Sequence, residues 1–227
     1  MARIALIIPA LNEEQALTQV LDEVPRALFA QILVVDNGSC DATATVARAR
    51  GAQVVSEPQR GYGRACLAGL AALEPGVDAV VFMDADASDV PAEATRLLEP
   101  IRCGQAELVI GSRTGQAEPG ALAWHQRWGN WLVVKLIRLL YGFAYTDLGP
   151  FRAIRRSSLE QLSLCDPDFG WTAEMQVKAI QCGLRVVEVP VSYRRRIGLS
   201  KISGTLTGTV RAGLKILWTI VRLRLMG

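Results

Sequence analysis

Short apolar runs alternate with segments of helical periodicity along the first half of the chain. The runs are rich in Val, Ile and Leu, which is typical of strands buried on both faces, and they lie at 3–9, 31–36, 52–56, 78–84 and 106–112. In the segments between them, apolar residues recur every three or four positions, which indicates amphipathic helices. The alternation predicts an α/β fold with a Rossmann-like, mostly parallel sheet that is flanked by helices on both faces.

Polar and conformationally special residues mark the expected ends of these helices. Asn12 is expected to cap the first helix, with Gln15 closing a capping box. Gly51 is expected to end the second helix. Pro91 suits the first turn of a later helix that runs to about Ile101.

The second half of the chain is less regular. Its periodicity predicts helices within 128–142 and 170–183. The stretch 146–156 is expected to form a turn that leads into a strand, and 184–196 is expected to contain another strand. Of four tryptophans in this half, at least two are expected to pack in the core, and the others are expected to line a lipid or sugar groove. The four are Trp124, Trp128, Trp131 and Trp171.

The C-terminal segment combines apolar residues at helical spacing with arginine and lysine. No uncharged run in it reaches the ~20 residues that a bilayer span needs. We therefore expect a domain over 1–203 and an amphipathic basic helix over 204–227. This helix is expected either to lie on an anionic membrane surface or to pack on the domain.

Composition and charge narrow the class of protein. The 227 residues are half hydrophobic with a net charge of +3, which fits one globular domain and gives no reason to expect a nucleic-acid partner. The five scattered cysteines form no C-x-x-C pair and are expected to be reduced thiols. One histidine, His125, argues against Ser-His catalysis and against a multi-histidine metal site. The opening apolar run is too short for a signal peptide, which predicts a cytoplasmic protein.

Three carboxylates follow the apolar run at 78–84, in the stretch VVFMDADASDVP. Asp84 and Asp86 face the same way on extended backbone, and two carboxylates ~6 Å apart repel by roughly 3 kcal/mol at an effective dielectric of about 20. A divalent cation offsets this repulsion, and Mg²⁺ or Mn²⁺ suits carboxylate and phosphate oxygens. Asp89 has the alternative of capping the helix that begins near Pro91.

The polar residues that follow the predicted strands are expected to meet at one edge of the sheet, where ligands bind in such folds. The stretches concerned are 9–13, 36–37, 84–89 and 112–113. The first turn lacks G-x-G-x-x-G and the stretch GYGRA lacks the G-K-[ST] of a P-loop, so neither of those nucleotide sites is expected. A phosphatase with Asp84 as nucleophile stays open, although such enzymes usually carry D-x-D on their first strand.

Eight segments, in order, resemble the family 2 glycosyltransferases, which have the GT-A fold. They are IIPALNEE, VVDNGSCDAT, GYGRA, MDADAS, IGSR, DLGPFRAIRR, GWTAEMQ and RRRIGLSK. The set is most similar to the branch that contains dolichyl-phosphate mannose synthase and bacterial polyprenyl-phosphate glycosyltransferases.

The resemblance implies a role for each matching residue. The nucleotide side would comprise Pro9, Leu11, Glu13, Asp36, Asn37 and Gly63, and the diphosphate would be held by Arg113, Arg195 and Lys201. Asp86 would bind the metal directly, with Asp84 near the ribose and metal and Ser88 as a further ligand. Arg152 would meet an acceptor phosphate, and Glu174 would be a general base, position the sugar, or face solvent.

The implied reaction is inverting transfer of a hexose from a UDP- or GDP-sugar to an acceptor, expected to be a polyprenyl phosphate. Such an enzyme would act in the cytoplasm, with peripheral contact to the inner face of the membrane. Two alternatives stay open. One is transfer to a soluble hydroxyl acceptor with Glu174 as base, and the other is the phosphatase.

Overall fold

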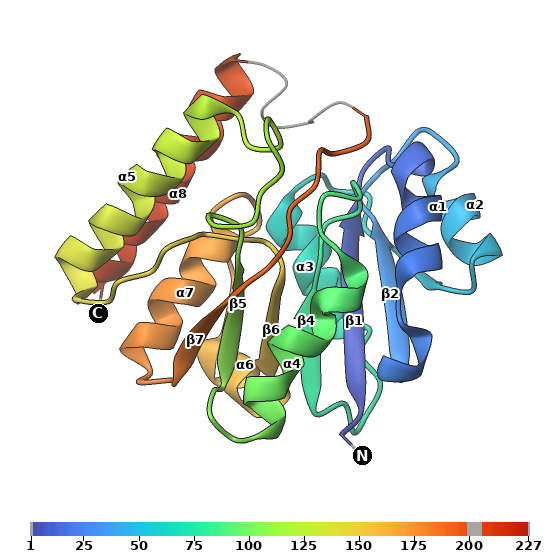
Figure 1. The fold of residues 1–227 in the computed structure, drawn as a ribbon, viewed down its shortest axis with the longest axis horizontal. Helices are drawn as coiled ribbons and strands as arrows, with labels where there is room; N and C mark the ends of the chain where they lie inside the picture. The colour runs from blue at the N-terminus through green and yellow to red at the C-terminus, as the bar shows by residue number, and fades with distance from the viewer. Residues whose placement is uncertain (1, 199–205, 227) are drawn as a thin grey trace.

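The computed structural model describes residues 2–198 and 206–226, and its centre is one seven-stranded sheet (Figure 1). The strand order is β3-β2-β1-β4-β6-β5-β7. The strands are β1 (Ile4–Ala10), β2 (Gln31–Asp36), β3 (Gln53–Ser56), β4 (Ala79–Phe82), β5 (Leu108–Ser112), β6 (Arg152–Arg155) and β7 (Val186–Pro190). Only β6 runs antiparallel to its neighbours, so the predicted mostly parallel sheet is confirmed.

Helices cover both faces of this sheet (Figure 1). One face carries α1 (Glu14–Glu23), α2 (Thr43–Ala49) and α4 (Ala94–Arg102), the last preceded by a 3₁₀ turn (Pro91–Glu93). The other carries α3 (Tyr62–Ala71), α5 (Trp124–Tyr141), α6 (Arg156–Leu162), α7 (Trp171–Gln181) and α8 (Leu206–Met226). A second 3₁₀ turn, Arg26–Leu28, precedes β2. Alternation along β1 feeds both cores, because Leu6 and Ile8 pack with α1 whereas Ala5 and Ile7 pack on the opposite side.

The structure confirms some of the predicted helix ends and contradicts others. Gly51 adopts a φ of 69° just after α2, and Pro91 lies in the turn that leads into α4, as predicted. The predicted cap at Asn12 is wrong: its φ is 52°, its side-chain oxygen accepts the Cys40 N–H at 2.8 Å, and α1 begins after Glu13 without a side-chain cap. Asp89 does not cap α4 either, since its Oδ2 accepts the Asp84 N–H at 3.1 Å.

The last helix packs beside α5 and α7. Tyr141 Oη donates to the Ile220 carbonyl at 2.7 Å, and Lys215 Nζ lies 3.1 Å from Asp166 Oδ2. Among the described residues, no helix is both long and apolar enough to span a membrane. The expectation that half of the four tryptophans pack in the core is wrong, because only Trp171 is buried. The five cysteines are free thiols.

Candidate functional site

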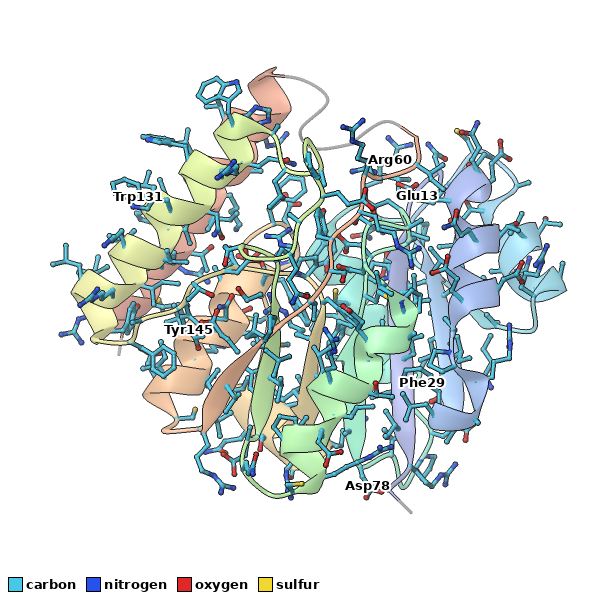
Figure 2. The ribbon with its side chains drawn as sticks, viewed as in Figure 1. Glu13, Phe29, Arg60, Asp78, Trp131 and Tyr145 are labelled. Atoms are coloured by element: carbon cyan, nitrogen blue, oxygen red, sulfur yellow. The ribbon has the colours of Figure 1, made fainter. Side chains whose placement is uncertain are left out.

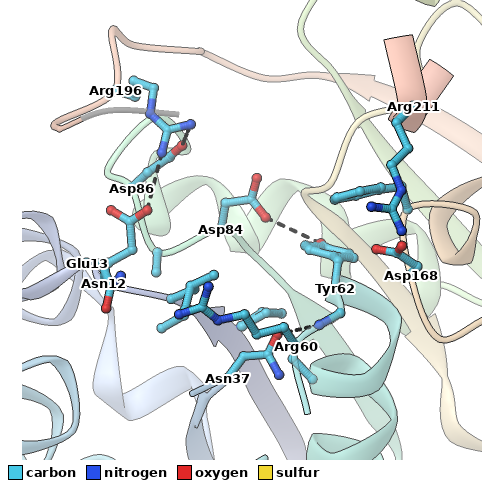
Figure 3. A pocket seen from close by; sticks show the side chains of 17 residues that line it. Asn12, Glu13, Asn37, Arg60, Tyr62, Asp84, Asp86, Asp168, Arg196 and Arg211 are labelled. Atoms are coloured by element: carbon cyan, nitrogen blue, oxygen red, sulfur yellow. Dashed lines mark hydrogen bonds and ion pairs between the residues drawn. The ribbon is translucent and has the colours of Figure 1, made fainter. Parts of the chain in front are cut away.

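The ends of β1, β2 and β4 border a cavity of about 580 Å³ (Figure 3). Its walls contain Pro9, Leu11, Glu13 and Asn37 from the first two strands and Asp84 and Asp86 from the loop after β4. The polar residues at the strand ends therefore meet at one edge of the sheet. Four further side chains that the sequence did not predict also line this cavity: Arg60, Tyr62, Asp168 and Arg211.

The loop after β4 holds the two carboxylates in a constrained geometry. Asp86 is almost fully buried, and its Oδ1 accepts hydrogen bonds from both the N–H and the hydroxyl of Ser88. Between them, Ala87 has a φ of 64°, which is rare for a residue with a side chain and clusters at functional sites. Tyr62 Oη donates to Asp84 Oδ1 at 3.3 Å. Ser88 therefore orients Asp86, and its hydroxyl proton is directed at that carboxylate.

Burial and the neighbouring carboxylates disfavour the ionisation of Asp84 and Asp89. Burial raises the pKa of Asp84 to about 7, and the neighbouring Asp86 carboxylate acts in the same direction. Burial likewise raises the pKa of Asp89 well above its usual range, with Asp84 and Asp86 contributing. Among the described residues no three His, Cys, Asp or Glu side chains form a metal-binding group. The donor set fits a hard cation that takes Asp84 and Asp86 from the protein and its other ligands from phosphate oxygens and water.

Arg196 forms ion pairs with two carboxylates of this site. Its Nη2 lies 3.2 Å from Glu13 Oε1 and its Nη1 lies 3.2 Å from Asp86 Oδ2 (Figure 3). Arg194 instead pairs with Glu23 at 2.8 Å. Arg195, the predicted diphosphate ligand, is exposed and donates to the Pro119 carbonyl at 2.7 and 3.0 Å. Sequence alone gave no signal to decide which of three consecutive arginines turns inward.

The nucleotide-side residues divide into cavity walls and supports. Asn37 does both: it lines the cavity, and its Oδ1 accepts the Gly61 N–H at 2.8 Å. Asp36 accepts the Ser39 N–H at 3.0 Å and lies outside the cavity lining. Gly63 is also outside it, and a Cβ at this position would lie 2.0 Å from the Asp166 carbonyl oxygen. Gly63 thus permits close packing of α3 against the loop before α7.

A second cavity, of about 910 Å³, meets the first at the carboxylates. The two share Tyr62, Asp84, Asp86, Phe169 and Arg196. The second cavity extends from there to α5 and α8, where Trp128, Trp131, Ala212, Gly213 and Ile216 line it.

Arg113 is fixed in the wall of the second cavity. Its Nε and Nη2 donate to the two carboxylate oxygens of Asp147 at 2.8 and 2.7 Å. Its guanidinium carbon also lies 5.0 Å from the centre of the Tyr193 ring. The bidentate ion pair with Asp147 and the stacked Tyr193 ring fix the position of the Arg113 guanidinium in this wall.

Two of the predicted acceptor-side residues lie outside both cavities. Arg152 is fully buried and donates to the carbonyls of Gly149 and Thr172, the latter at 3.0 Å. Glu174 is also fully buried: its Oε2 accepts the N–H groups of Cys165 and Asp166 at 3.0 and 2.7 Å. Arg152 thus connects β6 to the start of α7, and Glu174 connects α7 to the loop that precedes it. Lys201 lies outside the described residues.

Comparison with known proteins identifies the family. The model of "Glycosyl transferase family 2" matches residues 5–163. The chain belongs to this family. It is 39% identical to an uncharacterised glycosyltransferase of Mycobacterium tuberculosis, over 96% of this chain and 97% of the relative. It is 34% identical to an undecaprenyl-phosphate mannosyltransferase of Micrococcus luteus, over 98% and 99% of the two chains.

Solved structures agree with this assignment. Glucosyl-3-phosphoglycerate synthase from Mycobacterium tuberculosis, in complex with Mn²⁺, uridine diphosphate and phosphoglyceric acid, superposes with a TM-score of 0.80 at 25% identity. The match covers 98% of this chain and 78% of that one. The family 2 glycosyltransferase resemblance and the GT-A fold are therefore confirmed, and the chain is a glycosyltransferase.

Proposed function

We propose that this family 2 glycosyltransferase transfers a hexose, with inversion, from a UDP- or GDP-sugar to a polyprenyl phosphate, aided by Mg²⁺ or Mn²⁺. The Micrococcus luteus relative is named for undecaprenyl phosphate and mannose, which supports a prenyl acceptor. The synthase from Mycobacterium tuberculosis binds Mn²⁺ and uridine diphosphate, which supports a sugar nucleotide and a divalent cation.

The observation that carries the proposal is that the two cavities join at Asp84 and Asp86. The donor nucleotide would occupy the cavity beside β1 and β2, between Pro9, Leu11, Glu13 and Asn37. The acceptor would occupy the cavity that leads to α5 and α8. Attack from the second cavity on a sugar anchored in the first would allow the nucleophile to approach opposite the leaving diphosphate, which agrees with the inversion that the family resemblance implies.

Breaking the bond between the sugar and the diphosphate builds negative charge on the leaving group. A cation held by Asp84 and Asp86 would supply a fixed positive charge beside it. Arg196 and Arg113 both line the second cavity and would add donors, with Arg196 taking the role that the sequence suggested for Arg195. Lys201 stays a prediction for this group.

The acceptor class follows from the nucleophile's need for a base. A phosphate acceptor is ionised at neutral pH and attacks without one, whereas a hydroxyl needs a base within hydrogen-bond reach. Glu174, the proposed base for a hydroxyl acceptor, is buried outside both cavities. This favours the phosphate acceptor. The phosphatase alternative finds no support in the family match.

Thermal unfolding with UDP, GDP and their hexose derivatives, with and without Mn²⁺, tests the donor and the metal. One nucleotide should raise Tm by about 5–10 °C at saturating concentration, and only when the cation is present. Asp86→Asn should abolish this shift, whereas the exposed control Asp22→Asn should keep it.

Radiolabelled sugar transfer then tests the acceptor. Label should pass from the matching sugar nucleotide to polyprenyl phosphate and not to 3-phosphoglycerate. Two results would contradict the proposal. One is that Asp86→Asn, assayed in excess chelator, turns over as fast as the unmodified enzyme, and the other is a phospho-aspartate at Asp84.

A further inference from the structure

The outer side of the helix pair α5 and α8 exposes an unusual set of apolar side chains. On α5, Trp124, Trp128, Trp131 and Leu139 recur at helical spacing and are 79%, 60%, 53% and 80% exposed. On α8, Val210, Leu214, Trp218 and Leu225 do the same, each more than half exposed. The two helices lie side by side (Figure 1), and Trp131 points away from the sheet (Figure 2). We call these eight residues the α5–α8 face.

The charges around this face have one sign. Neither helix contains an aspartate or a glutamate. The exposed cations beside the face include Arg127, Lys135, Arg138 and Arg224. Arg211 is exposed as well but lines the first cavity, where it lies near Asp168 (Figure 3). Lys215 is the exception among their lysines, because it points inward to Asp166. An apolar stripe flanked only by cations is complementary to a surface that is apolar inside and anionic at its edge.

We propose that the α5–α8 face binds the surface of an anionic lipid bilayer, with both helices lying in the plane of the interface. Tryptophan side chains favour the interface because one end is apolar and the ring N–H seeks a polar partner. Arginine and lysine reach anionic headgroups while their methylene stems lie along the apolar surface.

The second cavity opens toward the same face, which links the bilayer to the site. Trp128 and Trp131 belong both to the exposed face and to the cavity lining, and Ile216 lines the cavity from α8. A lipid phosphate would therefore reach Asp84 and Asp86 with the first part of its chain in the second cavity and the distal part in the bilayer. This step rests on the proposed function, whereas binding to the bilayer can be measured without it.

A second copy of the chain is the less suitable occupant. In a two-fold dimer built on this face, Lys135 and Arg138 of each copy would face the same basic surface. With no acidic residue on either helix, nothing on the face would neutralise these cations. Lipid headgroups supply the missing negative charge.

Vesicle flotation tests the inference. The full chain should float with vesicles of about one part phosphatidylglycerol to two parts phosphatidylcholine, and bind phosphatidylcholine alone much more weakly. Lys135→Gln/Arg138→Gln should lower the partition coefficient on anionic vesicles by about 30-fold. The matched control Arg48→Gln/Arg102→Gln removes two exposed cations elsewhere and should bind like the unmodified chain.

Apolar contact is tested separately with Leu139→Ser/Trp218→Ser, at positions outside both cavities. This variant should lose roughly tenfold or more in partitioning. Circular dichroism should show unchanged folding for every variant, because the replaced side chains are exposed.

Several results would overturn the inference: no flotation of the unmodified chain, equal loss in the Arg48/Arg102 control, or a dimer in sedimentation velocity that the helix variants disperse without any lipid binding. Transfer to a short, water-soluble prenyl phosphate should be unchanged in the helix variants. If neither the unmodified chain nor any variant transfers sugar to this acceptor, but the unmodified chain still floats with the vesicles, the proposed function fails and the membrane inference stands.

Discussion

At the scale of single residues, the direction of three consecutive arginines decides the electrostatics of the site. Arg194 turns to Glu23, Arg195 to a backbone carbonyl, and Arg196 to Glu13 and Asp86. Arg196 lies beside Asp86, which is the proposed ligand of the cation. It therefore compensates part of the carboxylate charge when the nucleotide is absent.

Replacing Arg196 by alanine should weaken donor binding by about 10- to 100-fold, because a hydrogen bond to a charged group contributes about 1.5–3 kcal/mol. Arg195→Ala is the matched control, since it removes the same side chain one position away and should change donor affinity by less than about threefold. Calorimetric titration of the nucleotide with Mn²⁺ measures both. A larger loss in Arg195→Ala would restore the role that the sequence suggested.

Glu174 is fully buried and is expected to contribute to the stability of the fold. Its carboxylate accepts two backbone N–H groups and lies 2.9 Å from Lys178 Nζ. Glu174→Gln puts an amide donor against those donors, so the free energy of unfolding should fall by about 2 kcal/mol. Urea denaturation measures this loss. The turnover of the folded variant should stay within about threefold of the unmodified enzyme, and a thousandfold drop at unchanged stability would instead identify a base.

At the scale of elements, a glycine in the first turn of α3, Gly63, sets how closely that helix approaches the loop before α7. A Cβ on Gly63 would meet the Asp166 carbonyl oxygen at 2.0 Å, and backbone cannot move aside as a flexible side chain can. Gly63→Ala should therefore destabilise the protein by about 1–3 kcal/mol.

Gly129 in α5 provides the control for this substitution. No atom lies within 4 Å of its added Cβ, so Gly129→Ala should stabilise the protein by about 0.5–1 kcal/mol. Thermal unfolding of both variants measures the contrast. Equal effects at the two positions would show that helix propensity, and not contact with Asp166, governs Gly63.

The elements themselves were largely predictable. β2 has the predicted bounds, and the continuous apolar run of β1 is buried on both faces of the sheet, as predicted. Tertiary contacts overrode local signals at Asn12, whose side chain binds the Cys40 backbone and not the first turn of α1. The antiparallel direction of β6 had no local signal, because strand direction depends on how distant segments pair.

At the scale of the whole molecule, sequence order identified the strand-end cluster but not the second cavity. Asp84 and Asp86 are adjacent to an apolar strand, so their position at the sheet edge followed from the pattern. The second cavity combines α5 and α8, whose pairing joins segments about 80 residues apart, as the bond from Tyr141 to Ile220 shows. The exposure of Trp124, Trp128 and Trp131 followed from that packing and not from their residue type.

This cavity predicts that acceptor length and the helix pair are coupled. Trp128→Ala/Trp131→Ala removes two apolar walls of the second cavity and leaves the first cavity intact. KM for a long polyprenyl phosphate should rise by roughly tenfold or more, because the buried chain loses apolar contact. KM for the sugar nucleotide should not change, and a short prenyl phosphate that does not reach α5 should be used as before.

Trp124→Ala is the control for the tryptophans, since this side chain is exposed on the same helix but outside the cavity lining. Steady-state kinetics with detergent-solubilised acceptors removes the contribution of membrane binding. An equal rise in KM for long and short acceptors would place the prenyl chain elsewhere. A rise in the donor KM alone would mean that the second cavity holds the nucleotide, which would reverse the assignment of the two cavities.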